Sequence, residues 1–329
     1  MKIHNRGARV IFCAIVIAVV LRVPAAAQIV TIPVWHTSFV YNSTTYPVEL
    51  IGADPSLGAT TVIANEIVPM RFVFSDGKVL DGSSETTALI SSPIFASAPF
   101  ASGTTQYGDA VLRAEFWQSA QSSSYHVLLA APVIEPTYSL QVPAADGSTS
   151  TGPRGQIRGV LDFDWFVKSE EPMIISQLGI SPTTLTIFLT KNIRLQDGGS
   201  SFGGEHFSFD VRLGAERDRY TTVWAGASPG VVDSMSHEIN EWAHDPFNEN
   251  AVPPWFTPGT TGCNKHLEDA DPLVGTLFKI NGYELQDVAY VDWFAREVPS
   301  VALGGNYDVL GRFAAPASDC QFAPRRRYR

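Results

Sequence analysis

The chain has 329 residues, of which 45% are hydrophobic, enough apolar content for one large domain or two modest ones. It carries 33 Asp and Glu against 23 Lys and Arg, a formal net charge of −10. An acidic surface repels a phosphate backbone, which argues against nucleic acid as a partner. The basic run at 325–329 is a local exception that is typical of a solvated tail.

The first 27 residues have the three parts of a secretory signal. A basic start precedes an apolar run over 10–21, and alanines at 25–27 supply small residues for cleavage. This apolar run is too short to span a bilayer comfortably, and no second long apolar segment follows. We therefore expect a signal peptide over 1–27, a secreted or periplasmic protein, and no stable membrane insertion after cleavage. Cleavage would remove four of the 23 basic residues, namely Lys2, Arg6, Arg9 and Arg22. The mature chain would then have 19 basic residues against 33 acidic ones, a formal charge of −14.

Strand patterns dominate the beginning of the mature chain. Residues 28–60 are rich in Val, Thr, Tyr and Ile, which predicts an N-terminal β-rich extension. A hairpin is expected over 70–80, where apolar residues alternate and Asp-Gly at 76–77 supplies the turn. Apolar residues at helical spacing over 106–118 predict an amphipathic helix that could pack behind the candidate site.

Strands return beyond this helix. Residues 125–142 have strand character, and the Ser/Thr/Gly-rich segment 144–155 predicts a flexible insertion. Three later segments predict further strands: 185–190, 207–211 and 220–224. The Gly-rich segment 198–204 lacks the Lys of a phosphate-binding loop, so we expect a long hairpin loop there. The order of elements indicates an α+β chain.

One stretch carries the candidate chemistry: Ser236-His237-Glu238-Ile239-Asn240-Glu241-Trp242-Ala243-His244-Asp245-Pro246. Apolar residues recur at i, i+4 and i+7 over 235–242, which predicts a helix from about 233 to 244 that ends before the proline.

On this helix, His237 and Glu241 would lie one turn apart on the polar face and could hold one ion. Glu238 would lie beside that ion, where a general base is needed. His244 is two turns and about 10.5 Å of rise from His237, too far to share the ion. Its imidazole at the end of the helix would instead be favoured by the helix dipole.

The pattern His-Glu-x-x-Glu resembles the His-Glu-x-x-His helix of zincin metallopeptidases, in which two ligands one turn apart hold zinc and the Glu between them activates water. The resemblance implies these roles for His237 and Glu238. Glu241 departs from the pattern, because a carboxylate replaces the second imidazole. It can still bind zinc at a similar distance.

The third ligand must come from elsewhere in the chain. In the gluzincin group of zincins it is a Glu some 20 or more residues beyond the helix. Glu268, which follows Glu241 by 27 residues, is similar in position. Asp271 and then His266 are the next candidates.

A second resemblance covers about 65–300 and is most specific in its final third. Four segments there are similar to a group of exported, largely uncharacterised bacterial proteins: Ser236 to Pro246, Glu268 to Pro272, Asn281 to Asp287, and Trp293-Phe294. The first of them also resembles, more faintly, plant Exordium (phosphate-induced) proteins. The resemblance implies a zincin-like domain over 61–329. We expect it to contain a mixed, mainly antiparallel sheet, a backing helix and an active-site helix.

Two cysteines remain after signal removal, Cys263 and Cys320. In an oxidising compartment they have one possible pairing, so we expect a disulfide, which would stabilise the fold by roughly 4 kcal/mol.

Two functions stay open. The first is a secreted zinc-dependent metallopeptidase that hydrolyses peptide bonds of a peptide or protein substrate by metal-activated water, with Glu238 as general base. The second is a non-catalytic exported binding or structural protein on a zincin-like scaffold. The metal is open as well, because one His and two Glu suit zinc but would accept manganese, or calcium with more oxygen ligands.

Overall fold

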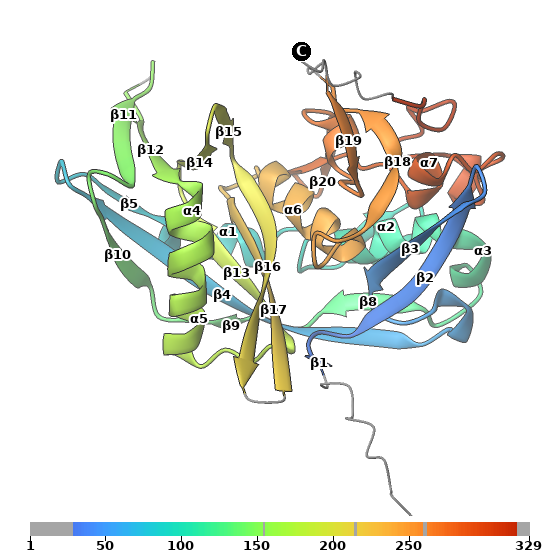
Figure 1. Cartoon of the computed structure of the whole chain (residues 1–329), viewed down its shortest axis with the longest axis horizontal. Coiled ribbons are helices and arrows are strands. Elements are labelled where there is room, and N and C mark those ends of the chain that lie inside the picture. Colours follow the sequence, from blue (N-terminus) through green and yellow to red (C-terminus); the bar gives the residue numbers. More distant parts are fainter. Residues whose placement is uncertain (1–28, 154, 214–215, 259–261, 321–329) are drawn as a thin grey trace, which may run out of the picture.

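The computed structural model describes residues 29–153, 155–213, 216–258 and 262–320. The expected signal peptide over 1–27 and the basic run at 325–329 lie outside the described residues. The fold is mixed α+β and contains several sheets (Figure 1), which confirms the predicted class. No helix among the described residues is long and apolar enough to cross a bilayer.

The largest sheet has nine strands and follows the order β1-β17-β13-β4-β10, with β16 beside β17 and with β5, β8 and β9 beside β4. Their bounds are β1 (Ile29–Val30), β4 (Thr60–Phe74), β5 (Val79–Asp81), β8 (His126–Leu129), β9 (Val133–Ile134), β10 (Tyr138–Val142), β13 (Thr184–Thr190), β16 (Gly204–Leu213) and β17 (Glu216–Gly226). The hairpin predicted over 70–80 is confirmed as β4 and β5.

Most neighbours in this sheet run parallel, so the expectation of a mainly antiparallel sheet is wrong here. Among the described pairings of this sheet, only β16 with β17 and β5 with β4 are antiparallel. Parallel neighbours need long crossover connections, and the one between β4 and β13 contains helices. Helices α1 (Thr86–Ile90), α2 (Tyr107–Glu115) and α3 (Trp117–Ala120) connect the β4–β5 hairpin to β8, and α4 (Phe163–Trp165) and α5 (Glu171–Leu178) precede β13.

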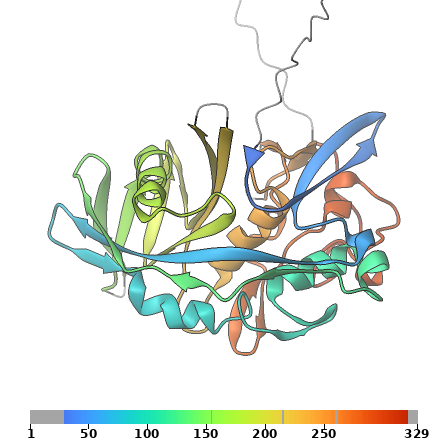
Figure 2. The ribbon, with the colours of Figure 1, turned by 90° about the horizontal axis from the view of Figure 1, so that it is seen from below.

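Strand β4 is 15 residues long and runs along most of the molecule (Figure 2). Its first half contributes Ile63 and Ile67 to one hydrophobic core cluster, and its second half contributes Met70 and Phe72 to another. One continuous strand therefore joins the two cores.

A smaller sheet has the order β11-β12-β14-β15. Residues 144–155, for which a flexible insertion was expected, include strand β11 (Gly147–Thr151), which pairs with β12 (Ile157–Asp162). The predicted loop 198–204 likewise contains β15 (Ser200–Phe202), which forms a hairpin with β14 (Ile193–Asp197). Pairing partners outside each segment turn these apparent loops into strands.

The other strands pair in small hairpins: β2 (Val34–Tyr41) with β3 (Thr44–Ile51), β6 (Ala98–Phe100) with β7 (Gly103–Thr105), β18 (Ala251–Phe256) with β19 (Cys263–His266), and β20 (Leu277–Ile280) with β21 (Tyr283–Gln286). Helix α7 (Val291–Ala295) follows β21 in the chain. The β2–β3 hairpin lies in the segment 28–60 that the sequence predicts to be β-rich, and β1 joins the main sheet at β17.

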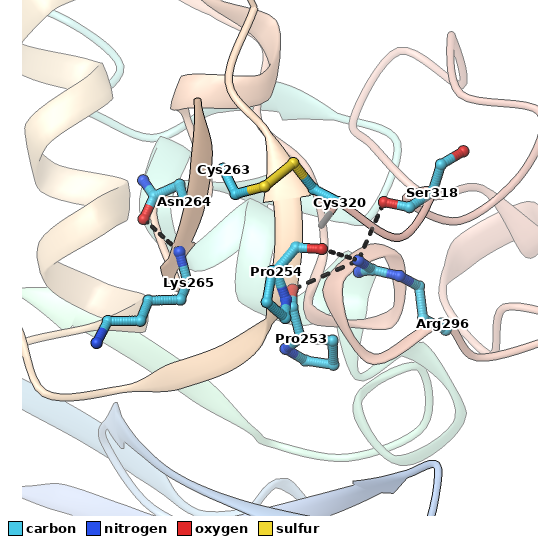
Figure 3. The surroundings of a disulfide bond; sticks show 8 residues. All are labelled: Pro253, Pro254, Cys263, Asn264, Lys265, Arg296, Ser318 and Cys320. Atoms are coloured by element: carbon cyan, nitrogen blue, oxygen red, sulfur yellow. Dashed lines mark hydrogen bonds between the residues drawn. A yellow bond between two sulfur atoms is a disulfide. The ribbon is translucent and has the colours of Figure 1, made fainter. Parts of the chain in front are cut away.

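A disulfide joins Cys263 at the start of β19 to Cys320 near the end of the described chain (Figure 3). Beside it, the Arg296 guanidinium donates hydrogen bonds to the carbonyls of Pro254 at 3.0 Å and Ser318 at 3.3 Å. The covalent and polar contacts together fasten the final segment to the β18–β19 hairpin.

Candidate metal centre

Helix α6 (Asp233–His244) has the bounds that the sequence predicts. Its apolar face packs into the core through Met235, Ile239 and Trp242. The indole Nε1 of Trp242 donates a hydrogen bond to Thr221 Oγ1 on β17 at 3.1 Å. Figure 1 shows the helix near the middle of the molecule, beside β16 and β17. Because core contacts fix one face of the helix, the polar side chains on the other face hold defined positions.

A cavity of about 560 Å³ lies against this polar face. Five of the candidate residues line it: His237, Glu238, Glu241, Glu268 and Asp271. His266 is paired with Ala251 in the β18–β19 hairpin and is outside the set of described residues that line the cavity. The structure thus brings α6 and residues 268–271 together. Such a second segment is needed, because α6 by itself would supply only two of the expected three ligands.

His237 and Glu241 meet one turn apart, with His237 Nε2 3.1 Å from Glu241 Oε1. The same Nε2 lies 3.8 Å from Asp271 Oδ1. Behind the ring, the side-chain amide nitrogen of Gln286 lies 2.9 Å from His237 Nδ1 and also donates to the carbonyl of Ala270 at 2.8 Å. The amide at Nδ1 leaves Nε2 as the ring nitrogen that faces Glu241 and Asp271.

A second histidine, His206, completes the cluster, and no spacing in the sequence singled it out. It lies in β16 and is 2% exposed. Its Nδ1 is 3.5 Å from Glu241 Oε2, and its Nε2 is 3.9 Å from Glu268 Oε2. The one available sequence signal is strand alternation, which places His206 on the opposite face from Phe207 and Phe209.

Two groups of three potential ligands share Glu241. Within each group the ligand atoms lie within 4.8 Å of one another. The first group comes entirely from α6 and consists of His237, Glu238 and Glu241. The second consists of His206 from β16, Glu241 from α6 and Glu268 from the segment after β19. Either group could hold a metal ion, and Glu268 belongs to the one that contains His206.

Glu238 lies against the first residue of β16. Its side chain is buried, and its Oε2 is 3.9 Å from His206 Nδ1. A Cβ on Gly204 would come within 2.3 Å of Glu238 Oε1 and 2.7 Å of its Cγ. Glycine at this position therefore leaves the room that the candidate general base occupies.

Carboxyl groups of the cavity have strongly shifted pKa values. Burial and the charge of Glu238 raise the pKa of Glu205 to about 8. Burial and the charge of Glu241 raise that of Asp271 to about 7. For Glu241, burial opposes ionisation, but His237 and His206 outweigh it and lower the pKa to about 2. Glu241 is thus the carboxylate that stays ionised between two imidazoles.

The donor set fits a divalent cation. Imidazole nitrogen and carboxylate oxygen are ligands of zinc and related ions. Glu241 Oε1 is buried and, although close to His237 Nε2, accepts no hydrogen bond. A bound cation would satisfy this oxygen. Coordination at His237 Nε2 would leave the ring proton on Nδ1, so the Gln286 amide would have to turn its oxygen toward Nδ1.

His244 has partners of its own outside the metal centre. Its Nε2 is 2.8 Å from Glu115 Oε2 on α2, and its Nδ1 is 3.0 Å from Asp269 Oδ2. Burial would lower the pKa of His244, but the two carboxylates outweigh burial and raise it well above its ordinary value. This buried network ties α6 to α2 and to the residue that follows Glu268.

Comparisons of the chain with protein-family models, with curated proteins and with solved structures found no match.

Proposed function

We propose that the protein is an exported, metal-dependent hydrolase of the metallopeptidase type. The observation that carries the proposal is the convergence of His237, Glu238 and Glu241 with Glu268 in one cavity. The His-Glu-x-x-Glu helix, held by its apolar face against the sheet, also supports a zincin-like scaffold. Peptides or proteins are the substrate class that this likeness favours.

His237 and Glu241 would hold the metal from α6, and Asp271, whose Oδ1 lies 3.8 Å from His237 Nε2, would supply the third ligand. Glu268 lies on the side of His206. We propose zinc, because its four-coordinate sites accept imidazole and carboxylate together. When bound, zinc supplies a Lewis acid that polarises a carbonyl oxygen and lowers the pKa of water.

Glu238 would act as the general base. Its carboxylate would accept the proton of the attacking water and deliver it to the leaving amine. Burial raises the pKa of Glu238 above its ordinary value, which suits a group that must both take up and release a proton near neutrality. Gly204 leaves space for this carboxylate, and His206 lies on its other side.

The disulfide supports the proposal of export. Disulfides persist in oxidising compartments and are rare in reducing ones. The bond between Cys263 and Cys320 encloses Glu268 and Asp271 in its loop, so an oxidising setting would also secure one wall of the centre.

Hydrolysis of a quenched fluorescent peptide library by the zinc-loaded mature chain tests the proposed function. We expect Glu238→Gln to lose about 100-fold or more of the activity, the usual contribution of a positioned base, while binding as much metal as the wild type. Glu297→Gln, at an exposed glutamate after α7, is the matched control and should retain full activity.

The result that refutes hydrolysis is also defined. If the protein binds metal but cleaves no member of the library, the alternative of a non-catalytic exported binding or structural protein replaces the enzyme. If neither zinc nor manganese binds in stoichiometric amount, the metal-dependent proposal is wrong as a whole.

A further inference from the structure

Glu241 lies between two histidines that come from different elements. Its Oε1 is 3.1 Å from His237 Nε2 on α6, and its Oε2 is 3.5 Å from His206 Nδ1 on β16. The carboxylate is 4% exposed, and Oε1 accepts no hydrogen bond. Each oxygen of one buried carboxylate therefore faces its own imidazole, as in a carboxylate that bridges two ions.

A single small ion cannot use both sides of this arrangement. Ligand atoms of one tetrahedral zinc ion lie about 2.0–2.2 Å from the metal and hence about 3.4 Å from each other. Among the described residues, no group of three or more ligand atoms within 4.8 Å of one another contains both His206 and His237. The two groups that do form share only Glu241.

The charge of the cavity also favours two ions over one. Beside the two histidines, the lining includes five carboxyl groups that lie near them: Glu205, Glu238, Glu241, Glu268 and Asp271. Histidines that bind metal are neutral. The lining also includes Arg194 and Asp233, whose opposite charges offset each other. If the other five groups ionise, one divalent cation leaves three negative charges around the buried Glu238 and Glu241 and the half-buried Glu205, Glu268 and Asp271, whereas two cations leave one. Uncompensated buried charge is strongly unfavourable.

We propose that the cavity binds two divalent transition-metal ions of the zinc or manganese type, bridged by Glu241. One ion lies on the His237 side, and the second is held by His206, Glu241 and Glu268. This inference rests on the proposed function and adds a second ion to it. Paired ions about 3.5–4 Å apart are a common device of hydrolases, because each can bind one of the oxygens involved in the reaction.

Counting metal ions tests the proposal directly. The mature chain is stripped with a chelator, dialysed against Zn²⁺ or Mn²⁺, freed of excess ion and analysed by plasma mass spectrometry. We expect two ions per chain in the wild type and one in His206→Ala. His266→Ala removes a histidine outside the cavity and should retain both ions.

Electron paramagnetic resonance of the Mn²⁺ form tests the bridge. Two ions that share Glu241 should give an exchange-coupled spectrum in the wild type, and His206→Ala should give the spectrum of an isolated ion. The wild-type count and spectrum do not depend on the folding of any variant. His206→Gln provides a second, more conservative substitution.

The outcomes separate this inference from the proposed function. One ion in the wild type, unchanged in His206→Ala, overturns the second site and leaves a single-ion hydrolase intact. Two ions without spin coupling overturn the bridge by Glu241. If the chain binds neither Zn²⁺ nor Mn²⁺, both the inference and the proposed function are refuted.

Discussion

Replacing Gly204 by alanine should displace the carboxylate of Glu238 with a modest effect on stability. The added Cβ would lie 2.3 Å from Oε1, 2.7 Å from Cγ and 2.8 Å from Cδ of Glu238. Ordinary contacts begin near 3.4 Å, so the carboxylate must move by about 1 Å. Overpacking of this kind usually costs about 1–3 kcal/mol of unfolding free energy. A shift of about 1 Å in a reacting group, however, can lower the rate about 100-fold.

Gly203→Ala is the matched control for this substitution. A Cβ on Gly203 would approach no described atom more closely than 3.7 Å, the distance to Arg194 Nη1. Peptide hydrolysis by the two variants should therefore differ by about two orders of magnitude. The urea unfolding curve of Gly203→Ala should stay close to the wild-type curve, and that of Gly204→Ala should shift by no more than about 1–3 kcal/mol of unfolding free energy. Wild-type activity in Gly204→Ala would refute the assignment of Glu238 as a base that acts from this position.

Three further predictions concern stability. The Cys263→Ser, Cys320→Ser double variant should lose about 4 kcal/mol of unfolding free energy, because the bond closes a separation of 57 residues; an unchanged thermal midpoint would contradict this. Burial and a neighbouring carboxylate raise the pKa of Asp287 from 3.8 to about 7, so its protonated form is favoured in the folded state. The stabilisation that Asp287 contributes should be complete below about pH 4 and lost by about pH 7. Across that window, the free energy of unfolding of the wild type should fall relative to that of Asp287→Asn. Glu115→Gln should cost about 3 kcal/mol in urea unfolding, because it removes one partner of the buried His244; a change near zero would show that the pair is dispensable.

Helix α6 was predictable because its signals are local. The apolar spacing over 235–242 sets its buried face, and Pro246 sets its end. The i, i+4 relation then places His237 against Glu241, whatever the rest of the fold does. His206 follows no such rule. Its approach to Glu241 depends on how β16 pairs with β17 and on how α6 packs against both strands, which are long-range features.

The direction of the main sheet escaped prediction for a related reason. An alternating pattern such as that of β13 identifies a strand but not its neighbours. All seven residues of β13 are buried, which is typical of a parallel strand covered on both faces. Helix α5, which precedes it, was not predicted. The segment 144–155 shows the same limit, since Ser- and Thr-rich residues form β11 only because β12 offers a partner.

The pairing of β1 with β17 bears on how the chain is made. Thr31 donates a hydrogen bond to the carbonyl of Arg219, 188 residues further along. Strand β13 also pairs with β17, so the main sheet cannot be completed until residues up to Gly226 have been synthesised. Folds that depend on such distant pairings form slowly. The main sheet, and with it the cavity beside α6, can therefore form only after most of the chain has been synthesised, because Glu268 of the cavity lies beyond Gly226 in the sequence.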